Sequence, residues 1–274
     1  MFSCVILIVK GRSFNPARQY NRGMPTALET LAKEIIECRQ CARLVAHCQH
    51  VAQVKRRAYR ECAYWGRPVP AFGDPDAKVM LVGLAPAAHG ANRTGRMFTG
   101  DRSGDFLYRA LFQTGFASQP ESVAAGDGMK LDGVYISAAV RCAPPGNKPN
   151  TDEIRNCHPF LKRELDLLKD VRVVVALGRI AFDVYLSILR EQGTIVSRSK
   201  FAFGHNRTHQ TGPGSPLLIS SYHPSQQNTS TGRLTEKMLL AVFRRVRKLI
   251  SQKSSSPERS GSEPRRPAPG ARNR

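Results

Sequence analysis

Four of the seven cysteines are spaced so that they could bind a metal ion or an iron–sulphur cluster. Cys38 and Cys41 form a Cys-x-x-Cys pair. Much later in the chain, fourteen residues separate Cys142 from Cys157. Zinc and iron–sulphur clusters both take four cysteine thiolates, although a zinc ribbon usually shows a second Cys-x-x-Cys pair. The spacing alone therefore leaves a cluster, a zinc ion and no metal as open alternatives.

The remaining cysteines are Cys4, Cys48 and Cys62. Cys48 or Cys62 could replace one of the four candidate ligands, and otherwise they are interpreted as small buried residues. The apolar run 2–9 has no basic region before it and makes a poor secretory signal. We therefore expect a cytoplasmic protein, where disulfides are rare and ligation is the favoured use of the thiols.

A second chemical candidate is the segment 83–101, which is rich in glycines and small residues and contains Phe98 and Asp101. Such a loop lets the backbone approach a ligand closely, and its N–H groups can bind an oxyanion or a phosphate. It contains neither a Walker loop nor a dinucleotide fingerprint. Phe98 suits stacking on a base. Asp101 precedes a helix predicted to begin near Ser103, so helix capping is its competing interpretation.

The elements that must position these residues follow from the hydrophobic pattern. Four continuous apolar runs predict strands that are covered on both faces; they are residues 79–84, 133–140, 171–178 and 217–221. The helical segments between and after them are 104–114, 151–169, 179–190 and 233–250. This alternation predicts an α/β fold, a three-layer α/β/α sandwich around a mainly parallel sheet. Ligands bind beyond the carboxyl ends of such strands, which are here residues 85–101, 141–157 and 222–233.

A further helix is predicted over residues 26–48, with Thr26 as its N-cap and Glu29 three positions later. We expect a single domain over residues 25–252. Residues 1–24 are interpreted as an extra, disordered leader, with Met24 as the true first residue. Residues 253–274 are interpreted as a disordered basic tail, since they are rich in Ser, Pro and Arg.

The charge balance indicates an anionic partner. Lys and Arg total 42 against 21 acidic residues, a net charge of +21. The segments 1–23 and 253–274 each carry an excess of four positive charges, so most of the excess belongs to the domain. Such a field favours nucleic acid first and an anionic membrane second, with a solvated surface as the competing interpretation. No stretch approaches the roughly 18 apolar residues that a membrane span needs.

Three long motifs resemble, in order, those of the type B (family 5) iron–sulphur uracil-DNA glycosylases. The first is Gly-Leu-Ala-Pro-Ala-Ala-His-Gly-Ala-Asn-Arg-Thr-Gly-Arg-x-Phe-Thr-Gly-Asp, over residues 83–101. The second is Arg-Cys-Ala-Pro-Pro-Gly-Asn-Lys-Pro, over residues 141–149. The third is Tyr-His-Pro-Ser-Gln-Gln-Asn-Thr-Ser-Thr-Gly-Arg-Leu, over residues 222–234. The resemblance covers about residues 27–250 and implies the uracil-DNA glycosylase-like fold.

The resemblance also implies an activity and a cofactor. It implies a monofunctional DNA-repair hydrolase, most simply a monomer on nucleoid DNA, that acts on double-stranded DNA. The enzyme would cleave the N-glycosidic bond of uracil, hypoxanthine and etheno bases and leave an abasic site. It would carry a structural [4Fe-4S] cluster, whose ligands would be Cys38, Cys41, Cys142 and Cys157.

The catalytic roles that the resemblance implies fall on two residues. His223 would donate a hydrogen bond to the negative oxygen of the departing base. Asp101 would position or activate the attacking water. Other uracil-DNA glycosylase families place a carboxylate or an amide just after the first strand, where this chain has Ala87 and Ala88. The water step therefore depends on Asp101 or on charge stabilisation alone.

The binding roles that the resemblance implies are distributed over three loops. The residues for the damaged base are Ala85, Phe98 and Asn147, and those for DNA are Gln226, Asn228 and Arg233. An amide such as Asn147 can donate to and accept from a base edge, but it also suits a turn beside Pro149. The segment after His223 is alternatively a surface loop that caps the last helix.

Two other functions compete with this reading. A zinc nucleobase deaminase needs His-x-Glu and Pro-Cys-x-x-Cys, and the chain contains neither. A non-catalytic DNA-binding redox sensor with an iron–sulphur cluster would explain the basic charge and the cysteines equally well. Such a sensor would have no use for Phe98, Asp101 and His223 around one cavity.

Overall fold

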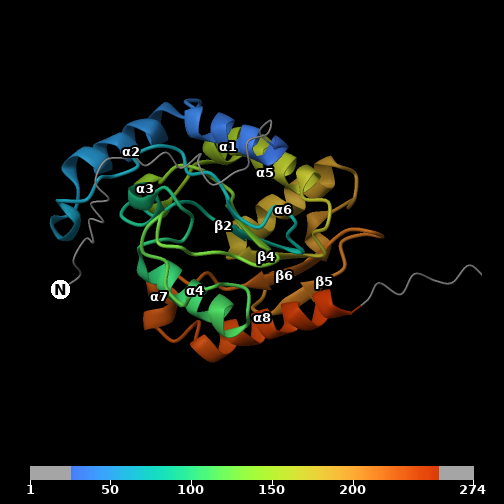
Figure 1. The fold of residues 1–274 in the computed structure, drawn as a ribbon. Helices are drawn as coiled ribbons and strands as arrows, with labels where there is room; N and C mark the ends of the chain where they lie inside the picture. Colours follow the sequence, from blue (N-terminus) through green and yellow to red (C-terminus); the bar gives the residue numbers. More distant parts are fainter. Residues whose placement is uncertain (1–25, 253–274) are drawn as a thin grey trace, which may run out of the picture.

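The computed structural model describes residues 26–252 of the chain (Figure 1). The expectations for the leader 1–24, for Met24 and for the tail 253–274 therefore lie outside the described residues. A six-stranded sheet forms the centre, in the order β1-β3-β2-β4-β6-β5. Its strands are β1 Phe72–Gly73, β2 Val79–Gly83, β3 Val134–Ala138, β4 Val173–Leu177, β5 Arg207–His209 and β6 Leu217–Ser221.

Helices cover both faces of this sheet, so the predicted α/β/α sandwich is confirmed (Figure 1). The helices are α1 Ala27–Glu37, α2 Ala42–Val54, α3 Ala91–Thr94, α4 Arg102–Gln113, α5 Thr151–Leu167, α6 Arg179–Glu191, α7 Gln226–Ser230 and α8 Glu236–Ser251. All four helices predicted between and after the strands are present, as α4, α5, α6 and α8. None of the helices in the described range is both long and apolar enough to cross a membrane.

The four predicted strands pair in parallel and nearly in register. Val79 of β2 lies opposite Val134 of β3 and Val173 of β4, and Val173 lies opposite Leu217 of β6. Because the strands start together and each has five residues, their carboxyl ends meet at one edge. The two antiparallel edge strands, β1 and β5, were not predicted, since they are short and lack a continuous apolar run.

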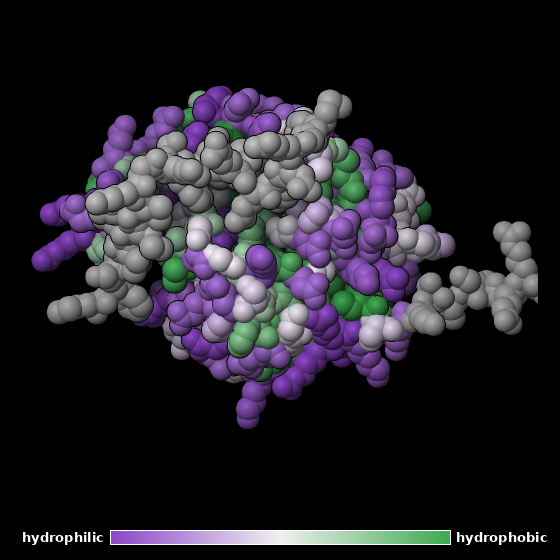
Figure 2. Space-filling model, viewed as in Figure 1, coloured by the Kyte–Doolittle hydropathy of each residue, from purple (hydrophilic) through white to green (hydrophobic). Residues whose placement is uncertain are grey.

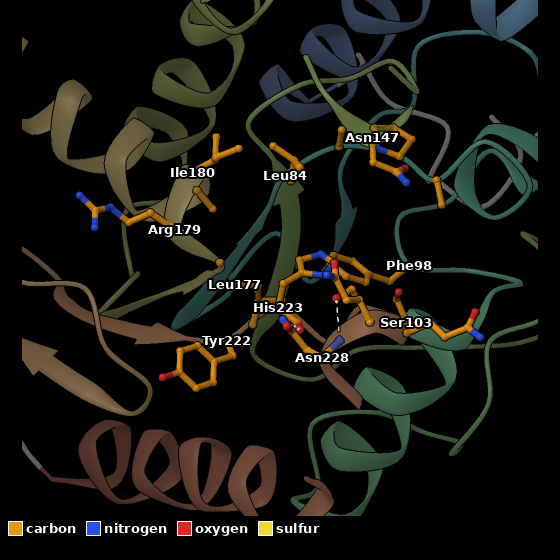
Figure 3. A pocket seen from close by; sticks show the side chains of 18 of the residues that line it. Leu84, Phe98, Ser103, Asn147, Leu177, Arg179, Ile180, Tyr222, His223 and Asn228 are labelled. Carbon is orange, nitrogen blue, oxygen red and sulfur yellow. Dashed lines mark hydrogen bonds between the residues drawn. The ribbon is translucent and has the colours of Figure 1, made fainter. Parts of the chain in front are cut away.

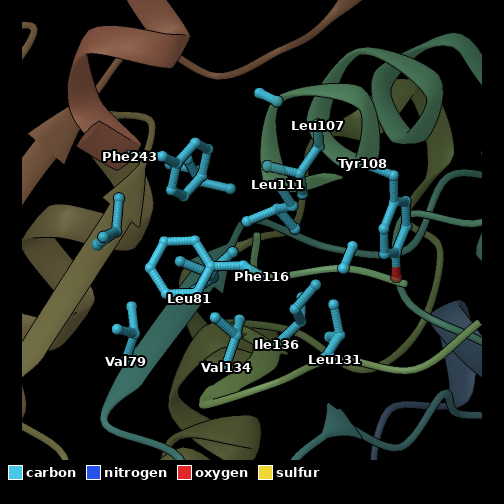
Figure 4. Close-up of a cluster of buried hydrophobic side chains, with 14 of the residues drawn as sticks. Val79, Leu81, Leu107, Tyr108, Leu111, Phe116, Leu131, Val134, Ile136 and Phe243 are labelled. Carbon is cyan, nitrogen blue, oxygen red and sulfur yellow. The ribbon is translucent and has the colours of Figure 1, made fainter. Parts of the chain in front are cut away.

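The side chains of β2 show why its sequence is continuously apolar. Val79 and Leu81 face the cluster formed with α4 and α8, which is drawn in Figure 4. Met80 and Val82 face the opposite cluster, formed with α5 and α6. All four side chains are fully buried, and each stabilises the fold by roughly 1.5–3 kcal/mol relative to exposure. A polar residue on either face would lose this contribution.

The single helix predicted over residues 26–48 is wrong, because the chain breaks at the Cys-x-x-Cys pair. Its start is confirmed: the hydroxyl of Thr26 accepts from the N–H of Glu29 at 3.2 Å, and the Glu29 carboxylate accepts from the N–H of Thr26 at 2.7 Å. At Cys38 the backbone turns to an extended conformation with ψ 135°, and Cys41 becomes the N-cap of α2. The break allows the two thiols to leave the helical surface.

A buried ion pair connects β3 to α5. The Glu164 carboxylate accepts from the guanidinium of Arg141 and from the hydroxyl of Ser137, both at 2.6 Å. The side chains of Arg141 and Glu164 are each 1% exposed. Their attraction must offset a large desolvation cost, so each charge depends on the other.

We expect Glu164→Ala to lower the free energy of unfolding by about 3–5 kcal/mol, because it leaves the buried Arg141 cation without its partner. The matched control is Glu34→Ala, which removes a carboxylate from Arg163 at the surface and should cost less than about 1 kcal/mol. Urea unfolding at neutral pH measures both. Equal losses for the two variants would contradict this account.

Candidate active site

A cavity of about 680 Å³ opens at the carboxyl edge of the sheet, as predicted for a parallel sheet. Residues after β2, β3, β4 and β6 contribute to its wall (Figure 3). Every predicted base-binding, DNA-binding and catalytic residue lines it. These residues are Ala85, Phe98, Asp101, Asn147, His223, Gln226, Asn228 and Arg233. A volume of this size is typical of a site for a small molecule or one nucleotide.

Phe98 lies against the end of β2. A side chain at Gly83 would bring its Cβ within 2.9 Å of the Phe98 ring, so the glycine makes this close approach possible. The backbone of Phe98 has a φ of 52°, an unfavourable left-handed conformation for a bulky residue. Such strain persists only where the surroundings impose it, and it is concentrated at functional sites. The loop thus holds an aromatic face at the cavity wall.

Two arginines hold the loop 84–101 in this shape. Arg93 donates to the carbonyls of His89 at 2.9 Å and Gly100 at 2.8 Å. Arg96 forms a buried ion pair with Asp127 at 2.6 Å. Arg93 therefore stabilises the loop from within, and Arg96 joins it to the segment that carries Asp127. This explains why a motif rich in small residues also needs two arginines.

Asp101 caps a helix and also lines the cavity. One oxygen, Oδ1, accepts from the N–H of Gly104 at 2.9 Å and caps α4. The other, Oδ2, lies where a Cβ on Gly90 would come within 1.8 Å, so only glycine fits there. Burial raises the pKa of Asp101 above its ordinary value. A carboxylate with a raised pKa is a stronger base, which suits the activation of water.

His223 follows β6 and faces Phe98 across the cavity, with ring centroids 5.8 Å apart (Figure 3). Burial lowers the pKa of His223 to about 4, so the imidazole is neutral at physiological pH. Its backbone carbonyl accepts from the amide of Asn228 at 2.9 Å. No hydrogen bond occupies either ring nitrogen within residues 26–252. The ring can therefore offer an N–H to a ligand.

The opposite rim carries the middle loop. Asn147 lies there with φ 58°, and its side chain is exposed and points to the cavity from the other side (Figure 3). Its backbone N–H donates to the carbonyl of Pro144 at 3.1 Å. Asn147 is therefore both a turn residue and a cavity residue. Its amide is free to meet a base edge.

The rim also contains residues that the sequence analysis did not single out. Gly178, Arg179 and Ile180 follow β4 and line the cavity. The rule for parallel sheets points to this strand end as well, and it could have found them. Arg179 is held by Asp183 at 2.7 Å, and Ile180 is 39% exposed. An apolar side chain at a cavity mouth is available to contact a ligand.

The segment after His223 is a short helix, α7, rather than an open loop. Gln226 is exposed at its start, and Asn228 bonds back to His223 as described above. The carbonyl of Asn228 also accepts from the N–H of Leu234 at 3.0 Å, which leads the chain into α8. The exposed Arg233 lies over the ring of Tyr222, 4.9 Å from its centroid. A polar surface thus borders the cavity, and the same segment connects to the last helix.

The four predicted ligand cysteines come together beside this cavity. Cys142 and Cys157 are buried in one cluster with Cys41 packed against it. The thiol of Cys142 is hydrogen-bonded to that of Cys48 and interacts electrostatically with those of Cys157 and Cys38. Cys157 interacts with both Cys41 and Cys38. Cys48 shares this cluster, and its sulfur accepts from the N–H of Ala143 at 3.2 Å.

No three potential ligands in the described range converge tightly enough to hold a single metal ion. A [4Fe-4S] cluster is larger than a single ion and is held by four cysteine thiolates. Cys38, Cys41, Cys142 and Cys157 could supply these four thiolates. The side chain of Arg141 supports the fit. Its Nε and Nη1 are buried and have no hydrogen-bond partner among residues 26–252, and its charge acts on Cys157. Unpaired buried donors are costly, and sulfurs of a cluster would accept from them.

Comparison with known proteins finds similar sequences. The sequence pattern of the Uracil DNA glycosylase superfamily matches residues 70–247. A type-5 uracil-DNA glycosylase from Thermus thermophilus is 49% identical over 221 residues, which cover 81% of this chain and 97% of that protein. A type-5 uracil-DNA glycosylase from Mycobacterium bovis is 51% identical over 213 residues, which cover 77% of this chain and 78% of that protein. A type-4 uracil-DNA glycosylase from Sulfurisphaera tokodaii is 26% identical over 224 residues, which cover 81% of this chain and 84% of that protein.

The low pKa of His223 predicts a specific dependence of stability on pH. Between about pH 6.5 and about pH 4 the unfolded chain binds a proton at this residue and the folded chain does not. Unfolding therefore takes up a proton, and stability falls as the pH is lowered through this window.

We expect His223→Gln to reduce this loss by up to about 3 kcal/mol, whereas the exposed His50→Gln should leave it unchanged. Urea unfolding at about pH 7 and about pH 4.5 measures the difference. If the wild type and the His223 variant lost equal stability on acidification, the assignment of a buried neutral imidazole would be wrong.

Proposed function

Because the chain belongs to the uracil DNA glycosylase superfamily, and within it to the type-5 enzymes, we propose that it is a DNA-repair hydrolase that removes uracil from DNA. The reaction is hydrolysis of the N-glycosidic bond, which leaves an abasic site. The observation that carries the proposal is one cavity that brings together Phe98 and Asp101, which follow β2, and His223, which follows β6. A redox sensor would need no such cavity.

The departing base is the first electrostatic problem of this reaction. The base leaves as an anion, and its oxygen gains negative charge in the transition state. A neutral His223 can donate an N–H to this oxygen without carrying a proton that must be replaced in each turnover. Such preorganised donors are strongest where water is excluded, and the low pKa of His223 reflects such surroundings. Phe98, facing the imidazole, stacks on the base.

Asp101 acts on the other side of the bond. Its capping oxygen fixes the carboxylate through the N–H of Gly104, and Gly90 leaves room for the second oxygen. A fixed carboxylate with a raised pKa can orient water at the anomeric carbon and accept its proton. The proton leaves the water as the C–O bond forms and the C–N bond breaks.

We further propose that the enzyme accepts several damaged bases. Ala85, Ala87 and Gly146 line the cavity with small side chains or none. The cavity therefore has room for the two rings of hypoxanthine or an etheno base, in addition to uracil. Asn147 would offer both a donor and an acceptor to the edge of these bases.

The preferred polymer in this proposal is double-stranded DNA in the nucleoid, bound by a monomer without a membrane. A base in a duplex must be flipped out before it can enter the cavity, at a cost of a few kcal/mol. The basic charge of the domain would offset part of this cost through phosphate contacts. Gln226, Asn228 and Arg233 border the cavity and would contact the strands beside the vacated position.

The proposed cofactor is a [4Fe-4S] cluster held by Cys38, Cys41, Cys142 and Cys157. When bound, it would supply four covalent cross-links between the α1–α2 break, the loop after β3 and α5. These segments hold the wall that carries Asn147. We therefore propose a structural role, in which loss of the group lowers stability before it affects chemistry.

The activity is tested on duplexes that carry one uracil or one hypoxanthine, treated with alkali to break abasic sites. We expect the wild type to produce breaks on both. His223→Ala should lower the single-turnover rate by about 10²–10³. Asp101→Asn should lower it by about 10²–10⁴, because asparagine keeps the cap and removes the charge.

His50→Ala and Asp132→Asn, two exposed positions outside the cavity wall, are the matched controls and should retain the wild-type rate. Duplex affinity should change little in all four variants. An iron-loaded wild type that binds DNA and breaks neither duplex would contradict the enzyme and favour the redox sensor.

The ligand set is tested separately by the iron and sulfide content of purified protein. We expect Cys142→Ser to lose the cluster and its visible absorption, and to melt at a lower temperature than the wild type. Cys48→Ala is the control, since Cys48 touches the same cluster of residues but is not a proposed ligand. Loss of iron from Cys48→Ala with retention in Cys142→Ser would show that the fifth thiol is the true ligand.

A further inference from the structure

Four exposed arginines lie on the segment that connects α2 to β1, outside the cavity and outside every role described so far. They are Arg56, Arg57, Arg60 and Arg67, and together they are called the arginine surface. The segment 55–67 carries five basic residues and only one acid, Glu61. We propose that the arginine surface binds the phosphate backbone of duplex DNA beside the damaged position. This inference rests on the proposed function only in taking DNA as the partner.

The arginine surface combines a high local density of positive charge with the absence of ion pairs. Five other exposed arginines are ion-paired with carboxylates; they are Arg43, Arg109, Arg155, Arg163 and Arg179. Further exposed arginines in the range 26–252, such as Arg244 and Arg245, also have no ion pair, but the arginine surface gathers four such groups between residues 56 and 67. None of the four guanidinium groups of the arginine surface has an acidic partner in the range 26–252. Like charges in one segment repel each other, so an anion that approaches all of them is attracted without first breaking an ion pair.

The arginine surface is joined by hydrogen bonds to the loop 84–101, which carries Phe98 and Asp101. The backbone N–H groups of Trp65 and Gly66 donate to the carbonyls of Arg93 and Asn92 at 2.9 and 3.0 Å. A Cβ on Gly95 would meet the Trp65 ring at 2.9 Å, so the two segments are in tight contact. This connection places the arginine surface at the same end of the molecule as the cavity, where α2 and α3 lie together in Figure 1.

Side-chain contacts also join the segment 55–67 to the loop 84–101. The guanidinium of Arg93 lies over the ring of Tyr59, 4.2 Å from its centroid. The hydroxyl of Tyr64 is hydrogen-bonded to Nδ1 of His89 at 3.0 Å, and His89 is not part of the cavity wall. Arg67 lies over the ring of Trp65 at 4.2 Å. A rigid arginine loses less entropy when it binds, and its planar group can donate two hydrogen bonds to one phosphate.

The geometry of the reaction favours duplex DNA as the occupant. A base that enters the cavity leaves its own phosphates and those of its neighbours at the rim. A row of free guanidinium groups beyond that rim matches the regular negative charge of the flanking duplex. These contacts would carry no sequence information, as expected for an enzyme that must search all DNA for damage.

The test uses the full chain and an undamaged duplex, with anisotropy titrations over a range of KCl concentrations. The variant is Arg56→Gln/Arg57→Gln/Arg60→Gln. The control is Lys78→Gln/Lys130→Gln/Lys169→Gln, which removes equal charge at exposed positions before β2, β3 and β4, at the opposite end of the sheet. All six side chains are exposed, so thermal unfolding should show both variants folded.

We expect the arginine variant to bind the duplex about tenfold or more weakly at moderate salt. Its slope of log affinity against log salt should fall by about 2–3, since each neutralised phosphate contributes about 0.9. The lysine control should keep the wild-type slope. Uracil excision at saturating protein should remain within about twofold of wild type in both variants, because neither changes the cavity.

Three results would overturn the inference. The first is a wild-type slope in the arginine variant, and the second is an equal loss in the lysine control. The third is an unchanged duplex affinity together with lost binding to vesicles of anionic lipid, which would assign the surface to a membrane. A wild type that binds the duplex but never excises uracil would defeat the proposed function alone, since the binding result does not depend on catalysis.

Discussion

The common register of four parallel strands is the constraint on which the site depends. β2, β3, β4 and β6 have equal lengths and start at paired positions, so four connections begin at one edge. Each connection then contributes one part of the cavity: an aromatic wall and a carboxylate after β2, an amide after β3, an apolar rim after β4 and an imidazole after β6. A shift of one residue in any strand would turn its buried side chains to the wrong face and move its connection.

Burial away from water shifts the pKa values of two groups that line the cavity. Burial raises the pKa of Asp101 and lowers the pKa of His223, so each group is moved toward neutrality. One becomes a stronger base and the other stays a neutral donor at physiological pH. The same surroundings give both groups the state that the proposed reaction requires. The loop that creates these surroundings is itself held by charges, since Arg93 and Arg96 bond within it and to the adjacent segment.

Arginine thus has three distinct uses in this protein. Arg141 and Arg96 are buried and paired with Glu164 and Asp127, where they connect segments of the fold. Five exposed arginines are paired with carboxylates at the surface and contribute little to stability. The arginine surface is neither buried nor ion-paired, and it is the part of the basic charge that we propose to bind the duplex. A net charge of +21 says nothing about this division.

Much of the fold and of the site followed from the sequence, for physical reasons. A strand with both faces covered must be continuously apolar, so the four central strands could be found, whereas the edge strands β1 and β5 could not. The ends of those strands pointed to Asp101, Asn147 and His223 because ligands bind there in parallel sheets. The prediction of one helix over residues 26–48 was wrong because apolar residues recur at helical spacing on both sides of the Cys-x-x-Cys pair. Apart from the two cysteines, the local sequence pattern does not mark the break.

The sequence by itself determined the residue types, the alternation of strands and helices, and the motifs that place the chain in its family. The tertiary structure decided which alternatives coexist: Asp101 is both a cap and a cavity residue, because its two oxygens face different partners. It also decided which charges are available to a partner, because the guanidinium of Arg93 donates hydrogen bonds within the loop while Arg56 and Arg57 remain exposed. Ion pairs, burial and the pKa values that follow from them depend on distances between segments far apart in the chain, and no local pattern contains those distances.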